Sequence, residues 1–127
     1  MSYFEHDLKA HLQASVAVSA IVGEKIYPEV IPQGVAVPAI VYTVIFGEPR
    51  NSLDGFTSGL INYQVQIDCW CATYEQALRL AHAVRDQVNT EYATFKTVIR
   101  EFPGQSDYED QTKRYRRMLY LSCWHHE

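Results

Sequence analysis

In the first part of the chain, the spacing of hydrophobic residues predicts helix at first and extended chain after it. Apolar side chains recur every four residues near the N-terminus and predict a helix over about residues 3–14. The residues of this stripe are Phe4, Leu8 and Leu12. A second apolar run, residues 15–22, ends at Gly23, as a short helix with a glycine C-cap would. Closely spaced prolines and a glycine make residues 26–38 extended or turning chain, which we interpret as an ordered apolar arm.

The middle of the chain carries two strand patterns. Residues 39–46 are β-branched or aromatic almost throughout, which indicates a strand covered on both faces or lying at a subunit contact. Residues 61–69 alternate apolar with polar side chains, so this strand should have one core face and one polar face. Residues 47–59 between them are too many for a two-residue turn and predict a long hairpin with a protruding tip.

A capping box and two further strands complete the pattern. Thr73 with Gln76 three residues later predicts the start of a helix whose apolar side packs on the sheet. That side consists of Ala77, Leu80, Ala81, Val84 and Val88. Alternation over residues 95–102, ended by Pro103 and Gly104, and again over residues 114–124, predicts two more strands. The acidic segment 105–112 between them is expected to be a solvated loop.

The order of elements is therefore helix, short helix, strand, strand, helix, strand, strand. A right-handed crossover through the long helix makes the third strand parallel to the second and leaves a gap that the last strand fills. The predicted sheet order is 1-2-4-3. The fold class is α+β: a roughly four-stranded, mainly antiparallel sheet with the N-terminal helix and the long helix on one face, and a long hairpin between the first two strands.

Composition fits a single domain over residues 1–127. The chain is 47% hydrophobic and 20% charged, with a net charge of −4, which disfavours a general polyanion binder with a basic surface. The first twelve residues are interrupted by charged side chains and do not resemble a signal peptide, and no apolar run is long enough to span a membrane. We therefore expect the chain to be made in the host cytoplasm.

Cysteine and histidine offer the most evident candidate for a metal site. The three cysteines cannot all pair within one chain, so reduced thiols are expected. Together with two C-terminal histidines they include the usual zinc ligands. The residues are Cys69, Cys71, Cys123, His125 and His126. In the predicted topology Cys71 and Cys123 lie at opposite ends of antiparallel strands, so we favour buried thiols and an exposed, frayed histidine terminus, and expect no metal or cofactor.

The other polar clusters indicate contact surfaces rather than catalytic sites. The sequence has none of the common nucleophile, zinc-protease or phosphate-loop motifs, which argues against an enzyme. The basic run 113–117 could contact phosphates, but we favour neutralisation of the acidic residues just before it. Trp70 and Trp124 fall on the more polar strand faces, either as anchors of a subunit interface or beneath a loop.

Several motifs together resemble the tail-completion family of long-tailed bacteriophages, which includes tail terminators or head-to-tail joining proteins. The most specific is residues 26–34, Ile-Tyr-Pro-Glu-Val-Ile-Pro-Gln-Gly, followed by Pro38, Ile40, Val41 and Tyr42. The small apolar turn ending at Gly23, the strand 65–70 and the helix opening at Thr73 agree in order. The resemblance spans roughly residues 4–100. It does not include the cysteines or the basic run.

This resemblance implies a structural protein of the virion, at the neck or top of the tail. Copies would form a hexameric ring on the tail tube, stop its polymerisation and join it to a head-tail connector or stopper protein. DNA would pass through the lumen without sequence recognition, and no membrane would be involved. Candidate contacts with a neighbour or the tube are Pro32, Gln33, Gly34, Pro38, Arg50, Asn51, Leu53, Asp54 and Phe56. Candidate charge contacts with the lumen or a partner are Arg114, Arg116 and Arg117.

Two alternatives stay open at this stage. The chain could be another neck or connector component of the same kind of particle, which binding to filled heads rather than tubes would reveal. It could also be an unrelated small α+β domain that binds a ligand, which a saturable shift in melting temperature would reveal.

Overall fold

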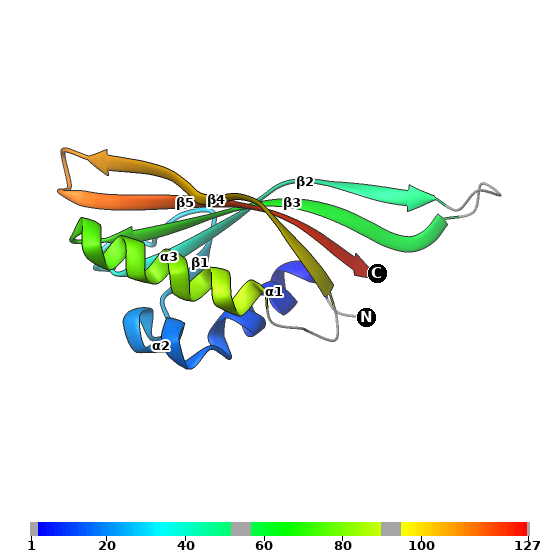
Figure 1. The fold of residues 1–127 in the computed structure, drawn as a ribbon, viewed down its shortest axis with the longest axis horizontal. Helices are drawn as coiled ribbons and strands as arrows, with labels where there is room; N and C mark the ends of the chain where they lie inside the picture. The colour runs from blue at the N-terminus through cyan, green and yellow to red at the C-terminus, as the bar shows by residue number, and fades with distance from the viewer. Residues whose placement is uncertain (1–2, 52–56, 90–94, 127) are drawn as a thin grey trace.

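The protein is an open twisted sheet with three helices on one face. The computed structural model describes residues 3–51, 57–89 and 95–126. All the helices lie under the same side of the sheet, and no described helix covers the other side (Figure 1). The elements are α1 (Phe4–Gln13), α2 (Val16–Val22), β1 (Ile26–Pro28), β2 (Ala39–Asn51), β3 (Thr57–Cys71), α3 (Tyr74–Val88), β4 (Phe95–Glu109) and β5 (Arg114–His126).

Local capping explains where the helices begin and end. The Ser15 hydroxyl accepts a hydrogen bond from the backbone N–H of Val18 at 3.1 Å and starts α2. Gly23 follows α2 with φ of 62°, a conformation that glycine adopts most easily. Thr73 caps α3 by accepting from the backbone N–H of Gln76 at 3.1 Å. All three predicted helices are therefore confirmed, with nearly the predicted bounds.

The predicted strand order is also confirmed, with one additional strand. The described sheet has the order β1-β2-β3-β5-β4. Its last four members are the predicted order 1-2-4-3, and each neighbouring pair among them is antiparallel. The additional strand β1 pairs parallel with β2 over only three residues, Ile26 to Pro28. Such a short strand, ending in a proline, gives no alternation that the sequence analysis could detect.

Both long hairpins contain more strand than the sequence predicted. The long hairpin predicted over residues 47–59 is present, and much of it is a two-stranded ribbon, because β2 continues to Asn51 and β3 begins at Thr57. The tip, residues 52–56, lies outside the described residues. The prediction of a loop over residues 105–112 is wrong for residues 105–109, because β4 continues through Pro103 and Gly104 to Glu109, with a register irregularity between Glu101 and Gln105. A proline and a bulge are tolerated there because β4 is an edge strand.

The core lies between the helices and the inner face of the sheet. Phe4 is fully buried, and its ring stacks on Tyr63 with 4.4 Å between centroids. The Nε2 atom of His125 lies 2.7 Å from an oxygen of Asp7 on α1, and His125 is only 1% exposed. The prediction of a frayed terminus is therefore wrong for His125, because this contact and the aromatic rings around it hold the end of β5 in the core.

The side chains of β2 become more exposed along the strand. Ala39 to Tyr42 are buried, as a strand covered on both faces should be. Farther along, Ile45 and Phe46 are 52% and 53% exposed, at a register irregularity between Val44 and Phe46. The prediction of a strand covered on both faces is thus correct only for residues 39–42.

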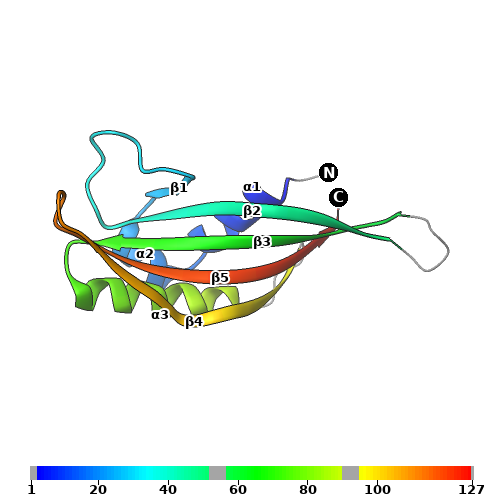
Figure 2. The same ribbon diagram turned by 90° about the horizontal axis from the view of Figure 1, so that it is seen from above.

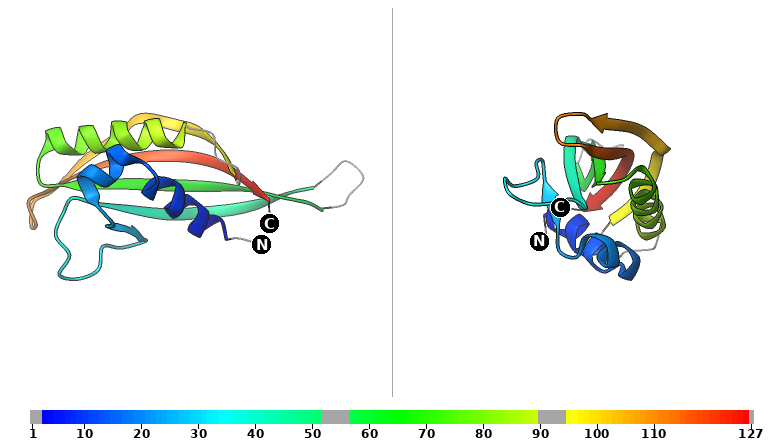
Figure 3. Two further views of the ribbon diagram at one scale, coloured as in Figure 1. Left: turned by 90° about the horizontal axis from the view of Figure 1, so that it is seen from below. Right: turned by 90° about the vertical axis from the view of Figure 1, so that its left-hand side faces the viewer.

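Two hairpins lie at opposite ends of the molecule's long axis. The β2–β3 ribbon extends past the helices at one end, and the β4–β5 hairpin closes the other end (Figure 2). The arm between β1 and β2 lies on the β1 side of the sheet, whereas α3 lies toward β4 (Figure 3). No helix within the described residues is long and apolar enough to cross a membrane.

Candidate functional site

The sheet face opposite the helices is polar and fixed by side-chain hydrogen bonds. Asn62, on this face of β3, is only 2% exposed and donates from Nδ2 to the Ser122 hydroxyl at 2.9 Å. Gln64 donates from Nε2 to the Asn62 side-chain oxygen at 2.6 Å and to the Ser122 hydroxyl at 3.0 Å. The network joins β3 to β5, so this face is rigid before any partner arrives.

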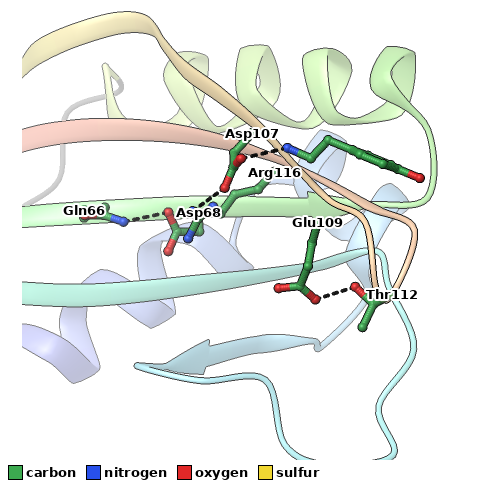
Figure 4. A network of polar contacts seen from close by, with 7 residues as sticks. Gln66, Asp68, Asp107, Glu109, Thr112 and Arg116 are labelled. Atoms are coloured by element: carbon green, nitrogen blue, oxygen red, sulfur yellow. Dashed lines mark hydrogen bonds and ion pairs between the residues drawn. The ribbon is translucent and has the colours of Figure 1, made fainter.

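A charged cluster occupies the same face near the β4–β5 hairpin. Arg116 pairs with Asp107 across the two strands, with 2.7 Å between Nη2 and Oδ2 (Figure 4). The Arg116 guanidinium also lies over the Trp70 ring, 4.9 Å from its centroid. Glu109 accepts a hydrogen bond from the Thr112 hydroxyl and so fixes the hairpin turn. These contacts hold the hairpin against the end of β3.

A shallow hollow of about 260 Å³ lies between this cluster and the arm. Its floor includes Asp68 and Trp70, and its sides include Glu29 from the arm and Arg114 from the hairpin. The hollow mixes carboxylates with guanidiniums and an indole ring, and it presents no hydroxyl or thiol nucleophile beside a base. Trp and Arg at an open, mixed-charge surface are typical of contacts with a protein partner.

Asp68 is the buried carboxylate of the hollow, with only 5% of the residue exposed. Burial raises the pKa of Asp68 above its usual value of 3.8, while the hydrogen bond from Gln66 and the charge of Arg116 oppose the rise. The ionised form is therefore less favourable in the folded protein than in the unfolded chain. Stability should increase as the pH falls through the raised pKa of the folded state toward 3.8.

We expect Asp68→Asn to raise the melting temperature at pH 7 by a few degrees, roughly, because it removes the buried charge. The gain should shrink as the pH falls to 4, because the wild-type carboxyl becomes increasingly protonated and less charge is buried. Calorimetry at both pH values measures this difference. Asp107→Asn, which removes the more exposed partner of Arg116, serves as the control and should not stabilise the protein. An equal gain at pH 4 and pH 7 would contradict the assigned cause.

The basic run lies beside acidic residues but does not share one face. Arg116 forms an ion pair with Asp107. The Nζ atom of Lys113 lies 3.6 Å from Oδ1 of Asp110. Arg114 is in register with Glu109 across the hairpin. Arg114 and Arg116 belong to the uncovered face. Arg117 is in register with Cys69 of the core face and is only 9% exposed. Of the three predicted arginine contacts, two are therefore placed where a partner could reach them.

The predicted contacts with a neighbour or the tube fall into two separate regions. Pro32, Gln33, Gly34 and Pro38 belong to the arm, where Gly34 has φ of 87°. The arm also exposes an apolar side chain, Val30, at 69%. Arg50 and Asn51 end the β2 side of the other hairpin, toward the opposite end of the molecule. Leu53, Asp54 and Phe56 lie outside the described residues.

The cysteines are separated and buried. Cys71 is in register with Tyr115, whereas Cys123 is in register with Tyr63, eight positions along β3. Eight residues of strand span roughly 27 Å, too far for one ion to bind both. Burial raises the pKa of both Cys71 and Cys123 to about 11, and that of Cys69 well above its usual value. Within the described residues, no group of three metal-binding side chains gathers anywhere.

Sequence reasoning missed two parts of this site. The hollow is lined by both Glu29 of the arm and Arg114 of the hairpin, which are far apart in the sequence and give no periodic signal. The burial of His125 depends on α1. The alternation of residues 61–69 did find the polar face.

A polar sheet face fixed by hydrogen bonds, two projecting hairpins and an apolar arm are typical of a structural α+β subunit that binds other proteins through its surface. The family model described as Tail completion protein gp17 matches residues 6–126, and the chain belongs to this family. It is therefore a structural tail completion protein of a phage-like particle and not an enzyme. The resemblance stated from the sequence is confirmed.

The fold has a solved counterpart. It is similar to a chain in the structure described as the virion of a native gene transfer agent particle, with a TM-score of 0.67 and 16% sequence identity. The match covers 99% of this chain and 100% of that chain. A comparison with curated protein sequences gives no significant match.

Proposed function

We propose that copies of this chain form a closed, hexameric ring at the head-proximal end of a tail tube. The ring ends tube polymerisation, joins the tail to the head connector or stopper protein, and lets DNA pass without reading its sequence. Membership in a tail completion family over residues 6–126 is the observation that carries this proposal. The similar fold of a chain in the gene transfer agent virion supports a place in the assembled particle.

The shape of the subunit supports assembly through repeated contacts. In a ring, each copy uses two different surfaces, one toward each neighbour, and the same contact repeats until the ring closes. The described sheet has two different edges, β1 with β2 on one side and β4 on the other. The two hairpins, at opposite ends of the long axis, are then available for the tube on one side and the connector on the other (Figure 2).

The arm and the β2–β3 hairpin are the proposed partner contacts. Pro32, Gln33, Gly34 and Pro38 lie in the arm and would contact a neighbouring subunit. The hairpin residues Arg50, Asn51, Leu53, Asp54 and Phe56 would contact a neighbour or the tube. Arg114 and Arg116 are proposed to contact the lumen or a partner, but Arg117 is buried.

Assembly without this protein tests the function. In a particle-producing strain that lacks the gene, we expect tails of excess and variable length that are not joined to heads, and supply of the gene on a plasmid should restore both. Electron microscopy measures tail lengths and the fraction of joined particles. Tails of normal length that merely fail to join would favour another neck component. Normal, joined particles would contradict the proposal.

A further inference from the structure

Among the described residues, no strand pairs with the outer edge of β2 beyond Tyr42. Strand β1 pairs only with Ile40, Val41 and Tyr42, although β2 continues to Asn51 (Figure 2). The backbone N–H of Ile40 donates to Lys25, and the carbonyl of Tyr42 accepts from Glu29, so these alternate residues direct their backbone groups toward β1.

Beyond the end of β1, alternate residues of β2 still direct their backbone N–H and C=O groups toward this edge. Val44 follows Tyr42 by two residues and therefore directs its N–H and C=O outward beyond the end of β1. The next residues are accessible: Ile45 is 52% exposed, Phe46 is 53% exposed, and Gly47 and Glu48 are also exposed. An accessible strand edge with two large apolar side chains is suited to accept another strand.

The other end of the sheet offers a matching strand. β4 is the last strand in the described order, so one of its edges has no neighbouring strand. Each step from β2 through β3 and β5 to β4 is antiparallel, so β4 runs opposite to β2. A second copy placed beside the first therefore brings its β4 antiparallel to β2 and continues the pattern of the sheet.

Charge complementarity favours this pairing. The strand registers place Glu48, Asn62, Trp124 and Lys96 in one row across the sheet. Glu48 stands at the β2 edge of that row and Lys96 at the β4 edge, and both are exposed. When copies line up edge to edge at the same level, Glu48 of one faces Lys96 of the next. Opposite charges on adjacent strands stabilise such a pair.

We propose that the open β2 edge, residues 43–48, binds the β4 edge of a second copy, with Glu48 opposite Lys96. The contact is heterologous, so it repeats around a ring. This inference rests on the proposed ring and specifies which surfaces form it. A ring could also be built through the arm alone, so the two proposals can fail separately.

Charge reversal tests the pairing. Glu48→Lys and Lys96→Glu should each shift assembly to about tenfold higher protein concentration, because each places like charges at every contact. An equimolar mixture of the two variants should assemble like wild type, because its mixed contacts restore opposite charges. Glu75→Lys, the same charge change at a 70% exposed side chain of α3, is the matched control and should have no effect. Mass photometry over a concentration series measures assembly, and melting temperatures confirm folding.

A disulfide provides an independent measurement. In one chain, the Cα atoms of residues 48 and 96 are three strand spacings apart, roughly 14 Å. A disulfide needs less than about 7 Å, so Glu48→Cys with Lys96→Cys can link only different copies. Mild oxidation should give a ladder of covalent oligomers that ends at the ring. The native thiols are buried and should not contribute.

The outcomes separate the two proposals. If wild type forms rings while the charge variants assemble equally well and the double cysteine variant stays monomeric on oxidation, the edge pairing is wrong and the ring stands. If wild type stays monomeric at every concentration, with and without tail tubes, both proposals are overturned.

Discussion

Phe4→Ala should lower the melting temperature by roughly 10–20 °C, the largest stability effect expected of a single substitution in this chain. Phe4 is fully buried, stacks on Tyr63 and meets the Phe95 ring edge-on with 5.6 Å between centroids. Truncation leaves a cavity where α1 joins the sheet, at a cost of about 3–5 kcal/mol. Calorimetry or thermal circular dichroism measures the change.

Tyr3→Ala is the matched control. Tyr3 is the neighbouring aromatic residue but is 67% exposed, so its truncation should change stability by less than about 0.5 kcal/mol. A Phe4 variant as stable as the Tyr3 variant would contradict the packing of α1 on the inner face of the sheet.

Replacing residues 52–56 with a two-residue Asn-Gly turn should abolish tail completion while leaving the subunit folded. The buried core residues of β2, Ile40 and Tyr42, lie well before the replaced segment, so the melting temperature should change by only a few degrees, roughly. Asn51 and Thr57 are in register at the end of the ribbon, so Asn-Gly, a favoured two-residue hairpin turn, should close it. Infectious particles should fall by at least about a hundredfold in complementation, since a lost assembly contact is expected to block most particles. Electron microscopy would show tails of irregular length or tails without heads.

Arg50→Lys keeps the length and charge of the hairpin and should complement the missing gene. If the shortened chain completed tails normally, the assignment of the hairpin to a neighbour or the tube would be wrong. The ring itself would then depend on the arm and the strand edges.

Local patterns predicted most of the fold because each has a local physical cause. Thr73 with Gln76 specifies a helix start, and Gly23 after an apolar run specifies a helix end, each within a few residues. The alternation from Ile61 to Cys69 separated the core face from the polar face of β3, and the crossover rule then ordered the strands.

The remaining features depend on contacts between distant parts of the chain. Pro103 and Gly104 normally end a strand, yet β4 continues because pairing with β5 resumes beyond them, at Gln105 with Met118. His125 looked like a frayed end but meets Asp7, 118 positions away. The hollow likewise joins Glu29 of the arm to Arg114 of the hairpin. Such pairings leave no periodic trace in the sequence.

The central claim is that this subunit works by assembling on a tail tube, and purified components test it most directly. Polymerising tail tube protein would be mixed with the purified chain and imaged by electron microscopy, while bound mass is measured by mass photometry. The account predicts a ring of six copies on one end of each tube and no further growth at that end. A chain that stays monomeric and leaves tube growth unchanged, or that coats tubes along their length, would contradict it.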